Sequence, residues 1–390
     1  METITINQTK PLIVPLTQEE QEAEAAEEPR IVGELLVTVH RLHGFSPTYF
    51  RRGAGSDPRY FGYSPALAKI AQFLADPASR SPAEPFLREP LSEMGEEVKA
   101  VTLGELQFFY RNPSRFFVEK RLEFRLPEDQ DLLQEEEPFG VGGLEAFNFK
   151  QQILDSIFDQ KPKSRLVSVW KGSGQLPPGP AGNLMANDMF SEAGPMADRL
   201  RERVGQAQRD LRRFQLTLGP FKVEGQLAVF PGVGLVHYRA AKVDPKKKGE
   251  AHLKLWIEHL LLHLTGWAGP RRSYLIGEDG TWEFQEVPDA AALLRPLLDL
   301  YLQGLAAPLP FFPMSSFAYT IGPGPKTAKT AEDLAWEAWE GNPDDEFGQG
   351  EMEDPYFSLC FRNHPDPLGK PFQQLASTVV RPLLNSQTEL

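Results

Sequence analysis

The sequence predicts an α/β fold, with α+β as the alternative, and three observations lead to it. The chain has 390 residues, of which 41% are hydrophobic, so it can bury a sizeable core. Two apolar runs, Val223–Phe230 and Val233–Tyr238, flank a Pro-Gly turn signal and predict a β-hairpin within Phe221–Arg239. Predicted helices precede and follow this hairpin, and strands bracketed by helices form layered sheets.

The N-terminal part of the chain carries little that predicts this sheet. Residues 1–30 are polar and acidic and lack aromatic side chains, which predicts a disordered tail or linker. A strand is predicted at Ile31–Val39. A helix is predicted at Pro65–Leu74, because Ser64 is a favourable N-cap and proline is favoured in the first helical position.

A change in composition marks the expected domain boundary. Residues 76–97 are rich in proline and charge and show little periodicity. We therefore expect residues 31–98 to end one region and residues 99–390 to form the C-terminal domain.

The C-terminal domain is predicted to open with helices. Thr102 and Glu105 have the spacing of a capping box, in which two side chains satisfy the first backbone N–H groups of a helix. Pro113 interrupts the apolar pattern that follows, so we expect two short helices or a kink with Asn112 at the junction. Another helix is predicted at Phe147–Phe158.

The next stretch is predicted to alternate between strand, loop and helix. Leu166–Trp170 is predicted as a short strand, and Gly172–Met185 as a loop because of its glycine and proline content. Met196–Phe214 is predicted as a helix that leads to a strand at Gln215–Leu218. Three arginines are then expected near the C-terminal end of that helix, where positive charge complements the helix dipole: Arg209, Arg212 and Arg213.

After the hairpin, three lysines are expected in a loop that precedes a helix at Ala251–Leu264. A strand pair is predicted at Ser273–Ile276 and Trp282–Val287, because a Glu-Asp-Gly turn joins the two runs. The remaining predicted helices are Ala290–Leu305, Ala331–Trp339 and Phe372–Val380.

Charge and cysteine content exclude several classes of protein. The formal net charge of −13 is concentrated in two acidic segments, so the rest of the chain is nearly balanced and a DNA-facing surface is compatible with it. One cysteine, Cys360, excludes an internal disulfide framework and a multi-cysteine zinc site. No apolar run approaches the length of a membrane span, so we expect a cytoplasmic protein without a membrane partner.

Three histidines fall near one face of the helix predicted at 251–264. His259 and His263 have the i, i+4 spacing of paired zinc ligands, and His252 lies one to two turns before them. No HExxH order and no nearby cysteine completes a site. We therefore expect a partly buried polar stripe or a partner contact here, and no metal or other cofactor.

Several short motifs occur together in a fixed order along the chain. They are His43-Gly44-Phe45-Ser46-Pro47, Phe61-Gly62-Tyr63-Ser64, Arg111-Asn112-Pro113, Glu137-Pro138-Phe139 with Gly143-Leu144-Glu145, Gly234-Leu235-Val236-His237-Tyr238-Arg239, Leu255-Trp256-Ile257-Glu258-His259-Leu260 and Arg381-Pro382-Leu383-Leu384. In order and spacing this set resembles the C-terminal part of the RecC family, the gamma chains of exodeoxyribonuclease V. Gly44 stands where that family usually has proline.

The resemblance implies a fold similar to the PD-(D/E)XK nucleases, used without nuclease chemistry. It spans nearly the whole chain but only about the last third of a full gamma chain, so we expect a fragment or a truncated product. Residues 31–98 would then be the end of a helicase-like region. Ala228, His237 and Arg239 occupy the hairpin positions where such nucleases carry two carboxylates and a lysine. Neutral and cationic groups cannot hold the two divalent ions of that chemistry.

The function implied is that of a non-catalytic DNA-handling and assembly module of the RecBCD helicase-nuclease, in double-strand break repair and recombination. Its partners would be single-stranded and forked DNA and the beta and alpha subunits of exodeoxyribonuclease V. The candidate DNA-binding residues are Arg209, Arg212, Arg213, Lys246, Lys247 and Lys248, although mixed-charge helices and basic loops are often simply solvated.

Two alternatives stay open at this point. The chain could be an active metal-dependent exonuclease whose carboxylates have moved to Glu224, Asp244 or Glu250, all close to the hairpin in sequence. It could also be a purely structural docking domain that makes no DNA contact.

Overall fold

The computed structural model describes residues 38–51, 56–75, 85–92, 95, 99–127, 143–158, 161–325, 327–341 and 349–390. Contacts divide the chain into two compact units, Met1–Glu84 and Pro85–Leu390. The acidic tail, most of the strand predicted at Ile31–Val39, and the Glu137-Pro138-Phe139 motif lie outside the described residues. No helix in the described part of the chain is both long and apolar enough to cross a lipid bilayer.

The first unit contains the predicted helix. Helix α3 spans Pro65–Ala75, and the backbone N–H of Leu67 donates to Ser64 Oγ at 3.4 Å, which confirms the expected cap. A 3₁₀ turn, η1, spans Pro47–Phe50, and the buried ring of Phe50 packs against Ala68 and Ala71 on the helix.

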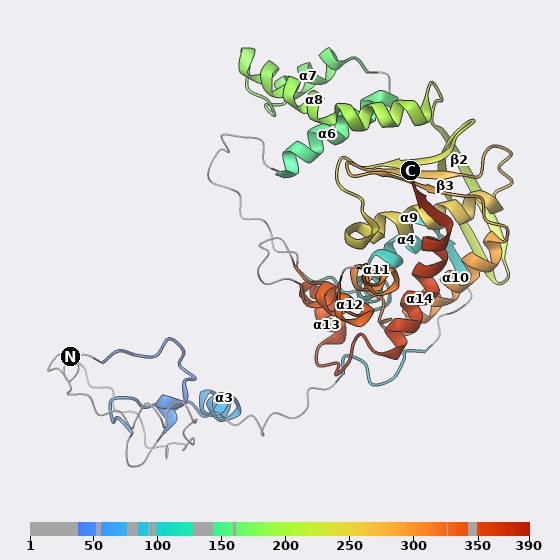
Figure 1. Ribbon diagram of the computed structural model, residues 1–390. Helices are drawn as coiled ribbons and strands as arrows, with labels where there is room; N and C mark the ends of the chain where they lie inside the picture. The colour runs from blue at the N-terminus through green and yellow to red at the C-terminus, as the bar shows by residue number, and fades with distance from the viewer. Residues whose placement is uncertain are drawn as a thin grey trace. The chain divides into compact units, whose positions relative to one another are not determined.

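The second unit is built on one mixed sheet with helices on both faces (Figure 1), which confirms the predicted α/β class. Its strands are β1 Ala100–Thr102, β2 Asp210–Leu218, β3 Phe221–Phe230, β4 Gly234–Tyr238, β5 Ser273–Ile276, β6 Thr281–Phe284 and β7 Gln387–Glu389. Its helices are α4 Leu103–Arg111, α5 Pro113–Phe116, α6 Gly143–Phe158, α7 Lys163–Gly172, α8 Gly179–Val204, α9 Pro245–Leu264, α10 Ala290–Ala306, α11 Pro313–Ile321, α12 Ala331–Glu340, α13 Pro355–Phe361 and α14 Lys370–Ser386, with short turns η4 Phe117–Arg121 and η5 Glu351–Glu353.

Strand β3 organises the sheet because three strands pair with it. β2 runs antiparallel along one whole edge of β3, from Asp210 opposite Val229 to Leu218 opposite Phe221. The other edge is shared, since β1 pairs in parallel with residues 222–224 and β4 pairs antiparallel only at 229–230. β4 then joins β5 in parallel, and β5, β6 and β7 continue the sheet in antiparallel order.

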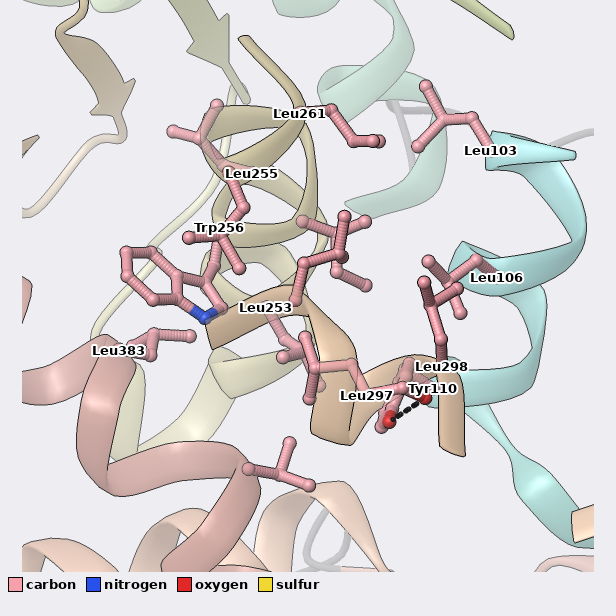
Figure 2. Close-up of a cluster of buried hydrophobic side chains, with 14 of the residues drawn as sticks. Leu103, Leu106, Tyr110, Leu253, Leu255, Trp256, Leu261, Leu297, Leu298 and Leu383 are labelled. Atoms are coloured by element: carbon pink, nitrogen blue, oxygen red, sulfur yellow. Dashed lines mark hydrogen bonds between the residues drawn. The ribbon is translucent and has the colours of Figure 1, made fainter. Parts of the chain in front are cut away.

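The main core lies on the face of the sheet that carries α9. Figure 2 shows leucines from α4, α9, α10 and α14 converging there around Trp256, with Tyr110 donating a hydrogen bond of 2.8 Å to the carbonyl oxygen of Leu297. The opposite face is covered by α6 and α8, whose Leu154, Met196 and Leu200 pack on the sheet residues Val236 and Tyr274.

Most helix and hairpin predictions are confirmed. Thr102 and Glu105 form both hydrogen bonds of a capping box, and Asn112 ends α4 and caps α5. The hairpin of β3 and β4 is present, as is the β5–β6 pair. The helices predicted at Pro65, Phe147, Ala290, Ala331 and Phe372 are all found, with ends displaced by a few residues.

Two predictions between residues 166 and 185 are wrong. Leu166–Trp170 belongs to helix α7, where Leu166 and the fully buried Trp170 are one turn apart on the face that packs against α8. A short apolar run has no period that separates a strand from a buried helical turn. The expected loop at Gly172–Met185 also ends early, because Pro178 precedes α8 and Pro180 fits its first turn.

The helix predicted at Met196–Phe214 is also wrong beyond Val204. Gly205 has φ 60°, a conformation that favours glycine and commonly ends helices, and the chain turns there into the longer strand β2. Arg209 therefore lies in the connection before β2, whereas Arg212 and Arg213 lie within that strand. The helix-dipole argument for these arginines does not apply.

The loop predicted for the three lysines is the first turn of α9 instead. Asp244 caps this turn through its Oδ1, 3.0 Å from the backbone nitrogen of Lys246, and Pro245 occupies the first helical position. Lys248 departs from helical geometry, with φ −135° and ψ 38°, so a kink separates this turn from the rest of α9.

Close packing between α4 and α10 gives a test of this core. Gly304 on α10 faces Phe109 so closely that a Cβ at this position would overlap the aromatic ring. Overpacking costs about 1–3 kcal/mol, which outweighs the gain of about 1 kcal/mol from replacing a helical glycine by alanine. Gly304→Ala should therefore lower the free energy of unfolding measured in urea.

Gly104→Ala is the matched control, because Gly104 lies in the first turn of α4 and a Cβ there meets nothing within 4 Å. This variant should be as stable as the parent chain or more stable. Equal effects of the two substitutions would show that α4 and α10 are not packed as described.

Candidate functional site

Two strands, β1 and β4, pair with the same edge of β3, and their separation creates a fork beside helix α9. β4 leaves β3 after two residue pairs, at Val229 and Phe230, and β1 takes the same edge further along, at Lys222. Between the diverging strand ends lie the N-terminal half of α9 and the last turns of α4. The end of β4 pairs with β5 along one edge, but its other edge has left β3 and lies beside a pocket, which we call the fork pocket.

The fork pocket has a volume of about 550 Å³ and is lined by residues from four parts of the chain. These are Gln107, Phe108, Tyr110 and Arg111 from α4, Gln151 from α6, His237, Tyr238, Arg239 and Leu275 from the region of β4 and β5, and Glu250, Ala251, Leu253, Lys254 and Ile257 from α9. A pocket of this size can enclose a nucleotide-sized ligand.

A buried carboxylate holds the base of the site together. Glu258 on α9 is 7% exposed, and its two oxygens lie 2.9 Å from His237 Nε2 and 2.7 Å from Gln107 Nε2. Burial alone would raise the pKa of Glu258, but His237, Gln107 and the charge of Lys254 together hold this pKa below its usual value. The carboxylate is thus ionised and fully engaged, with its hydrogen bonds joining β4, α4 and α9.

A second carboxylate lies between two arginines at the mouth of the fork pocket. Glu250 Oε1 is 3.6 Å from Arg239 Nη1, and its Oε2 is 3.8 Å from Arg111 Nε. Both distances exceed those of a hydrogen bond, so these are loose ion pairs. Lys254, which is exposed on the same helix, adds a third positive charge to the lining.

The three hairpin positions expected to replace a nuclease site do not converge. His237 and Arg239 both line the fork pocket. Ala228 does not, because it precedes Val229, which pairs with Leu235 and packs in the core on the α9 face. Side chains alternate along a strand. Ala228 therefore points to the face of the sheet that carries α8, away from His237.

The carboxylates proposed as relocated ligands are also separated. Glu224 is exposed and has the same alternation as Ala228, so it points away from α9. Asp244 caps α9, and Glu250 faces the two arginines. Across the residues that the structure describes, no group of three or more His, Cys, Asp or Glu side chains is close enough to hold a metal ion.

The predicted DNA-binding residues lie outside the fork pocket. Arg212 is 2.8 Å from Asp210 and lies over the ring of Trp267, with 4.8 Å between the guanidinium carbon and the ring centroid. Arg209 and Arg213 are exposed. Lys246, Lys247 and Lys248 are exposed on the first turn of α9, where Lys246 lines a second pocket of about 650 Å³ with Asp244, Asp279 and Arg381.

The histidine stripe of α9 is a set of buried hydrogen-bonding groups. His252 Nε2 lies 2.6 Å from the carbonyl oxygen of Val243, and His259 Nε2 lies 2.9 Å from that of Gln285. Burial, together with the nearby His263, lowers the pKa of His259 to about 3, so this imidazole is neutral at physiological pH. The buried polar stripe expected from the sequence is confirmed.

Sequence reasoning missed the residues that define the site most clearly, namely Glu258, Gln107, Arg111 and Lys254. Glu258 carried a signal, since it is an isolated acid within the apolar run Leu255–Leu262 and a buried charge needs partners. Arg111 belongs to the Arg111-Asn112-Pro113 motif and Gln107 to none, but nothing in the sequence indicates their contacts with α9, which only the fold creates.

The hydrogen bond between His237 and the buried Glu258 leads to a prediction about stability. In His237→Ala, Glu258 loses a hydrogen-bond partner while its ionised carboxylate stays buried, which should lower the free energy of unfolding by about 2–4 kcal/mol. Urea denaturation followed by tryptophan fluorescence measures the change.

The double variant His237→Ala/Glu258→Gln is the matched control, because a neutral amide at position 258 still reaches Gln107 and removes the unpaired charge. It should be more stable than His237→Ala alone. If both variants are equally unstable, the loss comes from packing around the histidine and not from the buried charge.

Comparison with known proteins places these features in a family. A model of the RecC C-terminal domain matches residues 98–321, which is more than half of the chain. The RecBCD enzyme subunit RecC of Escherichia coli (strain K12) is 28% identical over 225 residues, covering 57% of this chain and 19% of that protein. The RecC subunit of Mycobacterium tuberculosis (strain H37Rv) is 28% identical over 296 residues, covering 72% and 25%.

The RecC subunit of Buchnera aphidicola is 23% identical over 212 residues, covering 54% of this chain. The chain spans about a fifth to a quarter of the length of these relatives. The match of the family model extends from just before β1 through α11 and so includes β3, β4, α9 and the fork pocket. The chain belongs to the RecC C-terminal domain family.

Proposed function

We propose that this chain is a non-catalytic DNA-handling and assembly module of a RecBCD-type helicase-nuclease in recombination and double-strand break repair. It would guide single-stranded DNA from a fork and contact the beta and alpha subunits of exodeoxyribonuclease V. Membership of the RecC C-terminal domain family supports the assembly role, since the relatives are by name subunits of the RecBCD enzyme.

The content of the fork pocket is the observation that carries the non-catalytic part of the proposal. A hairpin nuclease needs clustered, solvent-accessible carboxylates. The lining of this pocket has one glutamate, which lies between two arginines, and the neighbouring Glu258 is buried and engaged by His237 and Gln107. An arginine is always protonated and cannot act as a proton-transfer base. The arrangement suits anion binding better than hydrolysis of a phosphodiester.

The likeness of the sheet to a PD-(D/E)XK nuclease core remains part of this proposal. A hairpin that diverges at its open end, a crossover helix and a parallel strand are consistent with it. The alternative of an active exonuclease requires Glu224 to act with other carboxylates, although it points to the opposite face of the sheet from Glu250. The purely structural alternative differs only in making no DNA contact.

A nuclease assay tests the absence of catalysis. The purified full chain, incubated with magnesium or manganese, should leave single- and double-stranded DNA intact, because the residues that the structure describes contain no cluster of carboxylates for two metal ions. The Glu224→Ala variant and a reaction with chelator serve as controls. Metal-dependent cleavage that disappears in Glu224→Ala would establish the exonuclease alternative in place of this proposal.

Salt dependence of DNA binding tests the lysines of α9. Changing Lys246, Lys247 and Lys248 to alanine should weaken binding to single-stranded DNA and reduce the slope of log affinity against log salt by up to about 2, if each lysine neutralises one phosphate. Changing the same residues to arginine keeps the three charges and should keep the slope. Equal slopes for the alanine and arginine variants would remove these lysines from the DNA-binding surface.

A further inference from the structure

We propose that the fork pocket binds one nucleotide of a DNA single strand, with its phosphate held between Arg111 and Arg239. This inference rests on the proposed DNA-handling function and names the site at which the strand would be held. It uses residues other than the lysines and arginines that the sequence suggested.

The charge of the pocket favours an anion. Arg111, Arg239 and Lys254 contribute three positive charges to the lining, against one carboxylate, that of the half-buried Glu250. Glu258 is not part of the lining, and its buried carboxylate is engaged by His237 Nε2 and Gln107 Nε2. A phosphate entering here would therefore meet a net positive surface, and partial burial would strengthen the attraction.

The two guanidinium groups are positioned by Glu250, and that of Arg239 also lies over the ring of Phe147, with 5.8 Å between the guanidinium carbon and the ring centroid. Glu250 holds them on either side of itself at 3.6 and 3.8 Å, distances that leave their N–H groups available for a better acceptor. Within the described part of the chain, no hydrogen bond to either guanidinium is observed. Planar N–H donors of this kind match phosphate oxygens in pairs, which makes arginine well suited to phosphate recognition.

The remaining walls fit a base and sugar better than a free phosphate ion. At about 550 Å³ the pocket is far larger than a phosphate, and part of its wall is apolar, formed by Ala251, Leu253 and the half-buried ring of Phe108. Aromatic side chains stack with bases of any sequence. Gln151 Oε1 accepts the backbone N–H of Ala240 at 3.0 Å and its Nε2 donates to Asp155 Oδ1 at 3.3 Å, which leaves one amide hydrogen for a polar group of the ligand.

The test measures binding of the full chain to a fluorescent oligothymidine by anisotropy. The double variant Arg111→Ala/Arg239→Ala should bind at least tenfold more weakly. Glu250→Gln should bind several-fold more tightly, because it removes the carboxylate that competes with phosphate, and a misfolded protein could not produce that gain. Arg271→Ala is the matched control, since Arg271 pairs with Glu286 outside the pocket and should leave binding unchanged.

Two further binding measurements identify the ligand. Phe108→Leu should weaken binding of oligothymidine but not of an abasic strand of the same length, which retains the sugar-phosphate backbone and lacks the bases. Inorganic phosphate should compete only weakly, and competition as strong as that of an unlabelled oligonucleotide would overturn the assignment to a DNA strand.

The outcomes separate this inference from the function on which it rests. If the parent chain binds DNA and both Arg111→Ala/Arg239→Ala and Glu250→Gln bind like it, the pocket assignment is overturned and the DNA-handling proposal stands. If the parent chain binds no DNA even at low salt, both are overturned and the structural docking alternative takes their place.

Discussion

The burial of helix α9 is the constraint on which the rest of this structure depends. Between His252 and Leu262 every residue is buried except Lys254, although three of the buried residues are polar. Each of these must find partners inside the protein, because an unpaired polar group in the core is costly. His252 is bonded to Val243 and Gln387, Glu258 to His237 and Gln107, and His259 to Ser273 and Gln285.

These contacts reach almost every neighbouring element. They extend to α4, to the strands β4, β5 and β7 and to the segment after β6, so the helix cannot rotate or slide without breaking several of them. The apolar residues of α9 fill the core shown in Figure 2, but apolar contacts alone would tolerate small shifts. The polar contacts fix the position of the helix, and with it the position of Glu250 and Lys254 beside the end of β4.

Local chemistry made much of this fold predictable. The capping box at Thr102, the junction at Asn112 and the hairpin turn after Phe230 depend on residues close in sequence, and each is found. Trp170 and Arg212 show where such reasoning fails. A run with no clear period was assigned as a strand, and a positive-φ glycine at 205 that ends a helix was overlooked.

The candidate site was predictable only in part. His237 and Arg239 lie in the pocket because they are close together at and just after the end of β4, which their positions in the sequence indicate. The sequence prediction grouped Ala228 with these two residues. The structure shows that Ala228 points to the opposite face of the sheet, because its neighbour Val229 pairs with Leu235 and faces α9. Gln107 and Arg111 come from a helix more than a hundred residues away, and no local pattern indicates that α4 and α9 meet.

Strand β2 has a consequence for the behaviour of the protein in solution. In the described part of the chain it pairs only with β3, so its outer edge presents unpaired backbone groups over nine residues. Such an edge is a template for joining a second sheet, and natural proteins commonly protect it with charge. Arg212 and Arg213 on β2, with Arg209 just before it, would bring like charges together if two copies paired through this strand. These arginines thus discourage edge-to-edge aggregation, a need that would not exist if the segment were the helix its sequence suggested.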